Sequence, residues 1–186
     1  MTDTLKKIVA ALLTAFICLP LCSCKSADGE EGILSYQDSA LKVTGTFTEN
    51  GVECRVTLTM SAPGEDGVRE QIELEFDPSE HTGGTAYGFR KNGSDYIAYC
   101  QDTEIPLSEK AALRALRASE LFCLKPEYIV SVEAAENGGG TVAVLKNSDT
   151  GEKWTVVTGE DGLPTEISSS PEGGDMSFII DSLEKQ

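Results

Sequence analysis

The chain has few basic residues and almost no histidine. Its 186 residues include 15 Lys and Arg against 31 Asp and Glu, for a formal net charge of −16. Affinity for a phosphate backbone or an anionic membrane comes mainly from clustered Lys and Arg, so this composition argues against nucleic-acid binding and a polybasic membrane patch. The one histidine, His81, excludes a Cys2His2 zinc site and leaves every triad-type hydrolase dependent on a single residue.

Motifs for metal or catalytic chemistry are also scarce. The sequence contains no C-x-x-C pair and no D-x-[DN]-x-[DN]-G calcium loop. The acidic pairs Glu73/Glu75 and Glu160/Asp161 fall on the wet face of a predicted strand and in a turn, which favours solvated carboxylates over a calcium site. His81 lies in a loop without an identifiable nucleophile partner. The sequence therefore predicts no enzyme, no metal site and no cofactor.

No hydrophobic run is long enough for a permanent membrane anchor. Residues 8–21 form a mainly apolar stretch of 14 residues that Pro20 interrupts, whereas a membrane-spanning helix needs roughly 20 apolar residues. Lys6 and Lys7 precede this stretch and small residues follow it, in the order of a secretory signal peptide. We expect residues 1–23 to be such a signal and the protein to be exported.

The end of this segment carries a lipidation signal. Leu21, Cys22, Ser23 and Cys24 resemble a bacterial lipobox, which implies cleavage before Cys24 and attachment of acyl chains, palmitate among them, to that residue. Because each buried CH2 contributes about 0.8 kcal/mol, several chains on one cysteine hold a soluble domain at a bilayer. The resemblance predicts a lipoprotein on the extracytoplasmic face of the cell membrane. The alternatives are an ordinary cleaved signal peptide with a chance cysteine, and lipidation at Cys22.

The residues after Cys24 are small, polar and charged, which is typical of a flexible tether. We therefore assign residues 24–40 to a tether and residues 41–186 to a single folded domain. Because the signal peptide contains two lysines and one aspartate, the mature chain has a charge of −17.

From residue 41 onward, apolar and polar residues alternate, which predicts antiparallel strands with one wet face. Asparagine-glycine pairs at residues 50–51, 92–93 and 137–138 mark hairpin turns. The spacing predicts about nine strands in a meander of sequential hairpins, without a crossover, and an open sheet of that size should curl. Ten short segments are candidates for these strands: residues 41–49, 52–60, 71–77, 85–91, 96–100, 129–132, 141–146, 153–158, 163–167 and 176–180.

Residues 108–124 form the one convincing helical stretch, with Ser108 as its expected N-cap. Three basic residues fall on one side of this helix: Lys110, Arg114 and Arg117. They predict a solvated face, with an anion site as the alternative. The residues expected in the core are Ala112, Leu113 and Leu116.

A strand–turn–strand segment carries a family resemblance. Residues 154–167 read as a strand, an acidic-glycine turn, a Leu-Pro pair and another strand. This segment, in an exported chain with a curled sheet and one helix, resembles the lipoprotein-carrier (LolA/LolB-like) superfamily. The resemblance implies a mainly β (α+β) half-barrel whose concave face, closed by helices, holds acyl chains or other hydrophobic ligands. The N-terminal helix of that family corresponds at best to residues 31–39.

Three aromatic residues are candidates for ligand contact on the concave face: Phe89, Tyr99 and Trp154. Ordinary core packing is the alternative, because a curled sheet must fill its concavity. Two functions remain open on this basis. One is a carrier that binds a lipid or other apolar ligand. The other is a non-enzymatic accessory lipoprotein without a small ligand, which contacts an exported protein or a cell-wall component.

The mature chain has three cysteines besides Cys24: Cys54, Cys100 and Cys123. An odd number leaves at least one thiol unpaired. We expect all three to be reduced and buried as small hydrophobic residues. Cys100 and Cys123 flank the helix and are the pair to expect if a disulfide forms.

Overall fold

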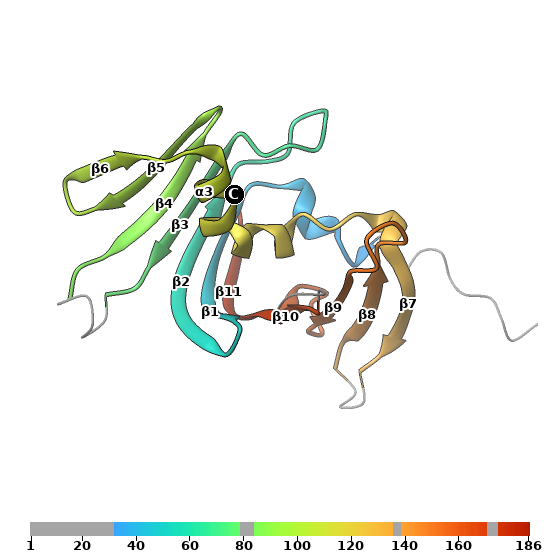
Figure 1. The fold of residues 1–186 in the computed structure, drawn as a ribbon. Helices are drawn as coiled ribbons and strands as arrows, with labels where there is room; N and C mark the ends of the chain where they lie inside the picture. Colours follow the sequence, from blue (N-terminus) through green and yellow to red (C-terminus); the bar gives the residue numbers. More distant parts are fainter. Residues whose placement is uncertain (1–31, 79–83, 136–138, 171–174) are drawn as a thin grey trace, which may run out of the picture.

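The computed structural model of the chain describes residues 32–78, 84–135, 139–170 and 175–186. The predicted signal peptide, the lipidation residue Cys24 and the loop residue His81 lie outside these ranges. In the described part, eleven strands form one antiparallel sheet that curls around a short helical segment (Figure 1). The fold is therefore mainly β, a curled open sheet with one central helix, as predicted. No helix in the described ranges has the length and hydrophobicity needed to cross a membrane.

The first six strands form one meander, in which each strand pairs with the next. Their bounds are β1 (Leu41–Glu49), β2 (Val52–Met60), β3 (Gln71–Phe76), β4 (Tyr87–Asn92), β5 (Asp95–Cys100) and β6 (Thr103–Pro106). Asn50 and Gly51 connect β1 to β2 with φ angles of 51° and 78°, as a two-residue type I′ hairpin requires. The sequence pattern does not predict β6, because all four of its residues are exposed and show no alternation.

The remaining strands form a second meander. Their bounds are β7 (Ile129–Ala134), β8 (Thr141–Lys146), β9 (Lys153–Thr158), β10 (Pro164–Ser169) and β11 (Met176–Lys185). The sheet order is β6-β5-β4-β3-β2-β1-β11-β10-β9-β8-β7. The chain therefore crosses from one edge of the sheet, β6, to the opposite edge, β7. The prediction of a meander without a crossover is correct within each half and wrong between the halves.

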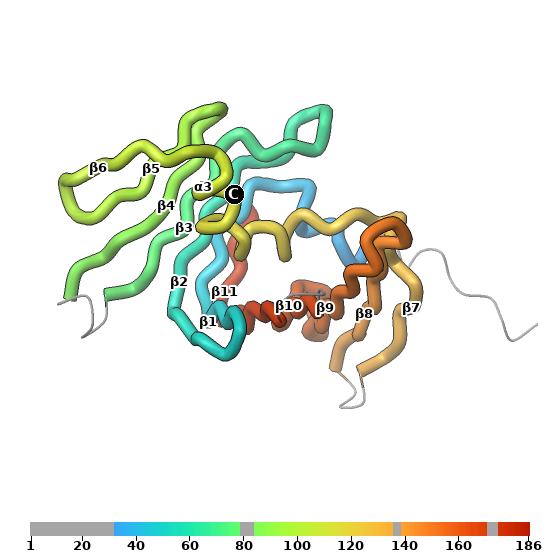
Figure 2. Tube along the Cα trace, in the orientation of Figure 1, coloured from blue at the N-terminus to red at the C-terminus, as the bar shows by residue number. Residues whose placement is uncertain are grey.

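The two halves meet where β1 pairs with β11, and Figure 2 shows these two segments side by side at the middle of the sheet. A bulge between Thr44 and Gly45 leaves Asp181 of β11 without a partner in the ladder. A bulge bends its strand and increases the local twist, so the sheet turns at this seam. Gly45 is required here: an added Cβ would collide with the carbonyl oxygen of Ile179 and lie 2.7 Å from Cε1 of Phe178.

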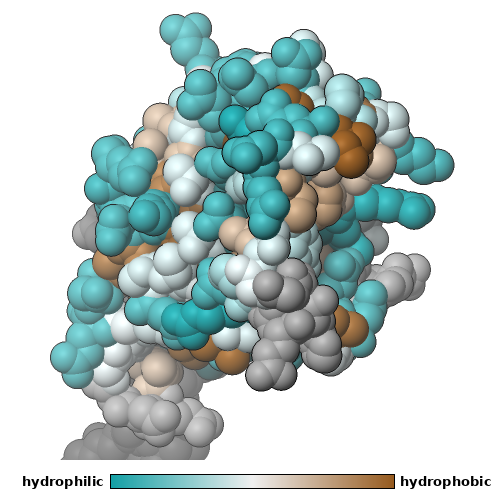
Figure 3. Space-filling view, turned by 90° about the vertical axis from the view of Figure 1, so that its left-hand side faces the viewer, coloured by the Kyte–Doolittle hydropathy of each residue, from teal (hydrophilic) through white to brown (hydrophobic). Residues whose placement is uncertain are grey.

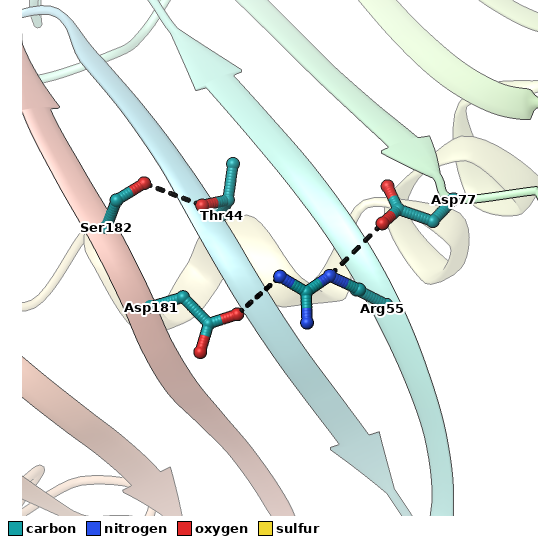
Figure 4. A network of polar contacts seen from close by, with 5 residues as sticks. All are labelled: Thr44, Arg55, Asp77, Asp181 and Ser182. Atoms are coloured by element: carbon teal, nitrogen blue, oxygen red, sulfur yellow. Dashed lines mark hydrogen bonds and ion pairs between the residues drawn. The ribbon is translucent and has the colours of Figure 1, made fainter.

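Polar side chains cross the seam on the outer face of the sheet (Figure 4). Arg55 of β2 reaches over β1, placing Nε 3.2 Å from Oδ2 of Asp77 and Nη2 2.9 Å from Oδ2 of the bulged Asp181. The hydroxyls of Thr44 and Ser182 are hydrogen-bonded at 2.6 Å. Exposed ion pairs stabilise little individually, so we interpret this network mainly as fixing the direction in which the bulge points.

The connection between the two halves is not the single helix predicted over residues 108–124. It contains an α-helix, α3 (Glu109–Ala115), a 3-10 helix, η4 (Arg117–Phe122), and a short turn, η5 (Pro126–Tyr128). In 3-10 geometry residues i and i+3 lie one above the other. This aligns Ala118 with Leu121 and Ser119 with Phe122, and all four are buried. The hydroxyl of Ser119 also donates to the carbonyl of Leu116 at 2.7 Å, at the junction of the two helices.

The segment formed by α3 and η4, the helical lid, covers the middle of the concave face. Phe122 of η4 is fully buried and packs edge-on against Phe178 of β11, with ring centroids 5.2 Å apart. Beneath it the inward residues of both halves are fully buried, among them Leu58, Val156 and Ile167. The centre of the half-barrel is therefore a filled hydrophobic core.

The N-terminal part of the described chain belongs to this core, so the boundary at residue 41 is wrong. Ile33, Leu34 and Tyr36 are 5%, 4% and 1% exposed, and residues 35–38 form a 3-10 turn, η2 (Ser35–Asp38). The Tyr36 ring packs edge-on against Phe122 at 6.5 Å. These residues lack the alternation used to recognise strands, and their burial follows from tertiary packing instead. The folded domain begins by residue 33.

A buried arginine holds this N-terminal segment in place. Arg69 is 4% exposed, and its guanidinium donates to the carbonyls of Gln37, Ser39 and Ser61. These bonds tie the turn before β1 and the end of β2 to the loop that carries Arg69. Because a buried charge must be compensated by hydrogen bonds, Arg69 fixes the course of both segments.

Both edges of the open sheet are poor templates for further strands. Edge β6 has four residues and ends at Pro106, which cannot donate a ladder hydrogen bond. Edge β7 contains a bulge between Ile129 and Ser131. Short, bulged or proline-terminated edges resist pairing with a second chain.

Candidate functional site

Part of the concave face extends beyond the helical lid. The main contacts of the 3-10 helix η4 with the sheet are on β3, β10 and β11, and those of α3 are on β4 and β5. The inward side chains of β4, β5 and β6 are nevertheless half-buried or exposed, so α3 covers this part of the sheet incompletely. Figure 3 shows the molecule from this side, where hydrophobic patches lie between mostly hydrophilic residues.

Aromatic rings line the inner surface of this part of the sheet, strands β3 to β6, which we call a wing of the half-barrel. Phe76 of β3 stacks on Tyr87 of β4, with centroids 4.8 Å apart and planes 3° from parallel. Phe89 of β4 meets Phe76 edge-on at 6.0 Å. The three rings share a face because Phe76 pairs with Tyr87 and because residues two apart on a strand point to the same side. The wing therefore has an aromatic floor.

A groove of about 310 Å³ lies on this floor. We call it the apolar groove. Its inward lining residues are Tyr87, Phe89, Ala98, Cys100, Thr103 and Ile105, and the intervening Gly88 and Tyr99 also border it. The volume is at the lower end of the range of about 300–1,000 Å³ for small-molecule sites. Ile105 is 58% exposed at its margin, so the groove is open to solvent.

The groove carries no formal charge. Partial burial raises the pKa of Tyr87, and the nearby Cys54 raises it further, so the phenol stays protonated at neutral pH. None of the lining residues is Asp, Glu, Lys or Arg. Such a surface favours apolar groups and offers at most one or two hydrogen bonds to an occupant.

The structure separates the three aromatic residues that the sequence singles out. Phe89 lies in the apolar groove. Trp154 lies on the concave face of the opposite half, where it is 8% exposed and stacked on Tyr128 at 5.7 Å. It fills the core there, which is the packing alternative. The two residues therefore belong to different wings and do not form one site.

Tyr99 lies on the outer face, opposite to the inward orientation predicted for it. It pairs with Gly88, which in turn pairs with the outward Glu75. The Arg90 guanidinium lies 5.3 Å from the centre of the Tyr99 ring, and the phenol oxygen lies 3.5 Å from Oε2 of Glu75. Partial burial raises the pKa of Tyr99, and the Glu73 and Glu75 carboxylates raise it further. The register of the β4–β5 hairpin decides which face Tyr99 occupies. The sequence pattern does not give this register, because it does not show at which residues the two strands end and the turn begins.

Comparisons with known proteins return structures only. No protein-family model and no curated protein matches the sequence. Among solved structures, MucB is 13% identical with a TM-score of 0.43, over 88% of this chain and 59% of the MucB chain. An uncharacterised conserved protein from Thermus thermophilus is 9% identical with a TM-score of 0.44, over 86% of both chains.

A LolA superfamily protein from Nitrosomonas europaea is 11% identical with a TM-score of 0.38, over 84% of this chain and 93% of that one. This chain spans 59% of the length of MucB. The strand order and the covered concave face of this chain themselves define a half-barrel.

The three described cysteines are free thiols. Cys54 is half-buried beside the aromatic floor, whereas Cys100 and Cys123 are exposed. The prediction that all three are buried is wrong for the last two, because Cys100 ends an uncovered strand and Cys123 follows the last turn of η4. Cys100 and Cys123 are not paired with each other.

The basic side of the predicted helix is not uniformly solvated. Arg117 donates to Glu49 of β1 at 2.6 Å, with both side chains about one third exposed, and so ties the lid to the sheet. Leu113, expected in the core, is 53% exposed, because the side of the helix that carries the buried Ala112 and Leu116 faces the sheet. Partial burial raises the pKa of Glu120, against the effect of Arg117. Ionisation of Glu120 therefore opposes folding as the pH rises through that pKa.

The acidic pairs considered for metal binding are dispersed. Asp161 accepts a hydrogen bond from the backbone N–H of Leu163 at 3.0 Å within its turn. Glu73 and Glu75 lie on the outer face of β3. Across residues 32–78, 84–135, 139–170 and 175–186, no three His, Cys, Asp or Glu side chains gather as they would around a metal ion.

Sequence reasoning missed most of the groove. Tyr87 carried a usable signal, because it lies two residues from Phe89 on the same predicted strand. The sequence gives no such signal for three other lining residues, Ala98, Thr103 and Ile105. Ala98 has a small side chain, and Thr103 and Ile105 belong to strand β6, which the sequence does not predict.

Proposed function

We propose that this protein is a lipid-anchored, extracytoplasmic binding protein that holds an apolar ligand, of the lipid type, in the apolar groove. It performs no catalysis. The observation that carries this proposal is the uncharged groove of about 310 Å³ on an aromatic floor, left open by the lid. Burial of apolar surface at roughly 25 cal/mol per Å² supplies the affinity, and Phe89 is the ligand-contacting residue retained from the sequence prediction.

Filling the groove should abolish ligand contact. We expect Ala98→Phe to occupy the space between β4 and β6, because Ala98 lies between Phe89 and Ile105 in the ladder. The measurement is photo-crosslinking of the full-length protein in cells fed a diazirine fatty acid, with the crosslinked peptides mapped by mass spectrometry. Crosslinks should fall within residues 87–105 and disappear in the variant.

The matched control is Ala111→Phe, the same substitution at an exposed position of α3. It should leave the crosslinks unchanged. Crosslinks that map to the opposite wing, or that persist in Ala98→Phe, would contradict the assignment of the groove.

The anchor is proposed at Cys24, on the lipobox-like sequence that ends there. Cys24→Ala should lose all metabolically incorporated fatty acid, because it removes the residue that carries the acyl chains. The variant should also leave the membrane fraction, because stable anchoring needs two or more such chains. Cys22→Ala is the control and should keep the label. Label that persists in Cys24→Ala would refute lipidation at this residue.

The second candidate function is an accessory lipoprotein without a small ligand, which contacts an exported protein or a cell-wall component. The filled centre of the half-barrel favours it, because Phe122, Phe178 and Ile167 leave no exposed concave surface beneath the lid. Native mass spectrometry of protein purified from its own host separates the two candidates. A co-purifying apolar mass supports the carrier, and a clean apo mass in every preparation supports the accessory role.

A further inference from the structure

A larger hollow lies on the outer face of the same wing, on the opposite side of the sheet from the apolar groove. Its volume is about 530 Å³, and it lies over the ends of β2, β3 and β4. The polar residues that the inference uses are Thr59, Ser61, Gln71, Glu73, Arg90 and Asn92, all of which line it. We call it the polar hollow.

The strand register arranges four of these residues in a two-by-two array. Gln71 pairs directly with Asn92, and Glu73 pairs directly with Arg90. Opposed residues on antiparallel strands lie about 5 Å apart, and residues two apart along a strand about 7 Å apart on the same face. The array therefore presents four side chains over an area about 5 Å by 7 Å. Thr59 extends it by one strand, because it pairs with Glu73.

All four side chains of the array end in planar groups that make two hydrogen bonds side by side. Glu73 accepts with both oxygens, Arg90 donates from a fork, and the amides of Gln71 and Asn92 donate and accept. Each hydroxyl on a sugar ring can both donate and accept a hydrogen bond. One planar side-chain group can therefore hydrogen-bond to two neighbouring hydroxyls at once. The amides of Gln71 and Asn92 are exposed and available to a ligand.

Arg90 is held in position for such a role. Its Nη2 lies 2.8 Å from Oε1 of Glu104, and its guanidinium stacks over the Tyr99 ring at 5.3 Å. Its Nε is buried and has no hydrogen-bond partner among the described residues. A buried donor without a partner is costly and calls for an explanation.

From this array we propose that the polar hollow binds a neutral saccharide. Arg90, Glu73, Gln71 and Asn92 hydrogen-bond to neighbouring ring hydroxyls. The site is separate from the apolar groove, since it uses outward side chains of β2, β3 and β4, whereas the groove is lined by inward side chains of β4, β5 and β6. A free disaccharide and the end of a glycan polymer share this chemistry.

The test is isothermal titration of the detergent-solubilised full-length protein with cellobiose and with N,N′-diacetylchitobiose, together with retention on chitin beads. We expect saturable binding of at least one probe. Gln71→Ala and Asn92→Ala should each raise its Kd about tenfold, which corresponds to about 1.4 kcal/mol. Arg90→Lys should weaken binding similarly, because lysine keeps the charge and loses the planar fork.

Glu166→Ala is the matched control, an exposed outward position on β10, and it should leave binding unchanged. Thermal unfolding of each variant shows that the fold is intact. Binding to a disaccharide assigns a free sugar, and retention on beads alone, lost in Gln71→Ala, assigns a glycan polymer. No binding of any probe, or equal binding by wild type and the array variants, would overturn the proposal. Neither result bears on fatty-acid crosslinking in the apolar groove.

Discussion

Phe122→Ala is expected to destabilise the domain by about 3–5 kcal/mol, the usual cost of removing a fully buried phenylalanine from a core. Phe122 is 0% exposed and packs edge-on against two rings, Phe178 at 5.2 Å and Tyr36 at 6.5 Å. Those rings belong to β11 and to the N-terminal turn. One truncation therefore weakens the contacts of the lid, the seam and the N-terminal segment together.

Urea unfolding followed by circular dichroism measures this effect as a change in the free energy of unfolding. Leu113→Ala is the control, because it shortens a side chain of the same lid that is 53% exposed. We expect the control to change stability by less than about 1 kcal/mol. A loss in Phe122→Ala as small as that expected for the control would show that Phe122 is not a core element.

Gly45→Ala is expected to destabilise the domain by about 3 kcal/mol, at the upper end of the usual range for overpacking. The added methyl group would collide with the carbonyl oxygen of Ile179 and lie 2.7 Å from the Phe178 ring. The first of these obstacles is backbone, so the β1–β11 seam must shift at its bulge. A flexible side chain could move aside at far lower cost.

Gly32→Ala is the matched control, because a Cβ added there meets no atom within 4 Å and the φ of Gly32 is not positive. It should be neutral or slightly stabilising, since it reduces the entropy of the unfolded chain. Thermal and urea unfolding of both variants give the comparison. Equal stability of Gly45→Ala and the wild type would mean that the seam adapts without cost.

Most strands were predictable because one face of each is wet, and β6 was not, because all four of its residues are exposed. Residues 41–49 and 52–60 alternate in the sequence and match β1 and β2, and the Asn50-Gly51 turn follows from the need for two positive φ angles. The bulge at Asp181 was not predictable, since local alternation says nothing of an extra residue opposite a distant strand. The crossover between β6 and β7 was missed for the same reason, because the alternation of apolar and polar residues within one strand does not determine which other strand it pairs with.

The helical lid and the site show where tertiary contacts override local propensity. Residues 116–122 look helical in sequence, but two columns of buried residues three apart favour the tighter 3-10 turn. Phe89 was correctly placed on the inner face by alternation. Tyr99 was not, because its face depends on the register across the β4–β5 turn. Register is set by pairing rather than by hydrophobicity when a strand is half-buried on both sides.

The pairing of the first strand with the last has a consequence for how the chain reaches its native state. The hydroxyls of Thr44 and Ser182 that meet at the seam are 138 positions apart in sequence. Contacts of such large separation must close a long loop first, which slows folding relative to helical proteins of similar stability. The N-terminal meander can form its hairpins during synthesis, but β1 stays an unpaired edge until residues 176–185 have emerged. Until then the nascent chain exposes that edge, and a partner that shields it would protect the chain from aggregation.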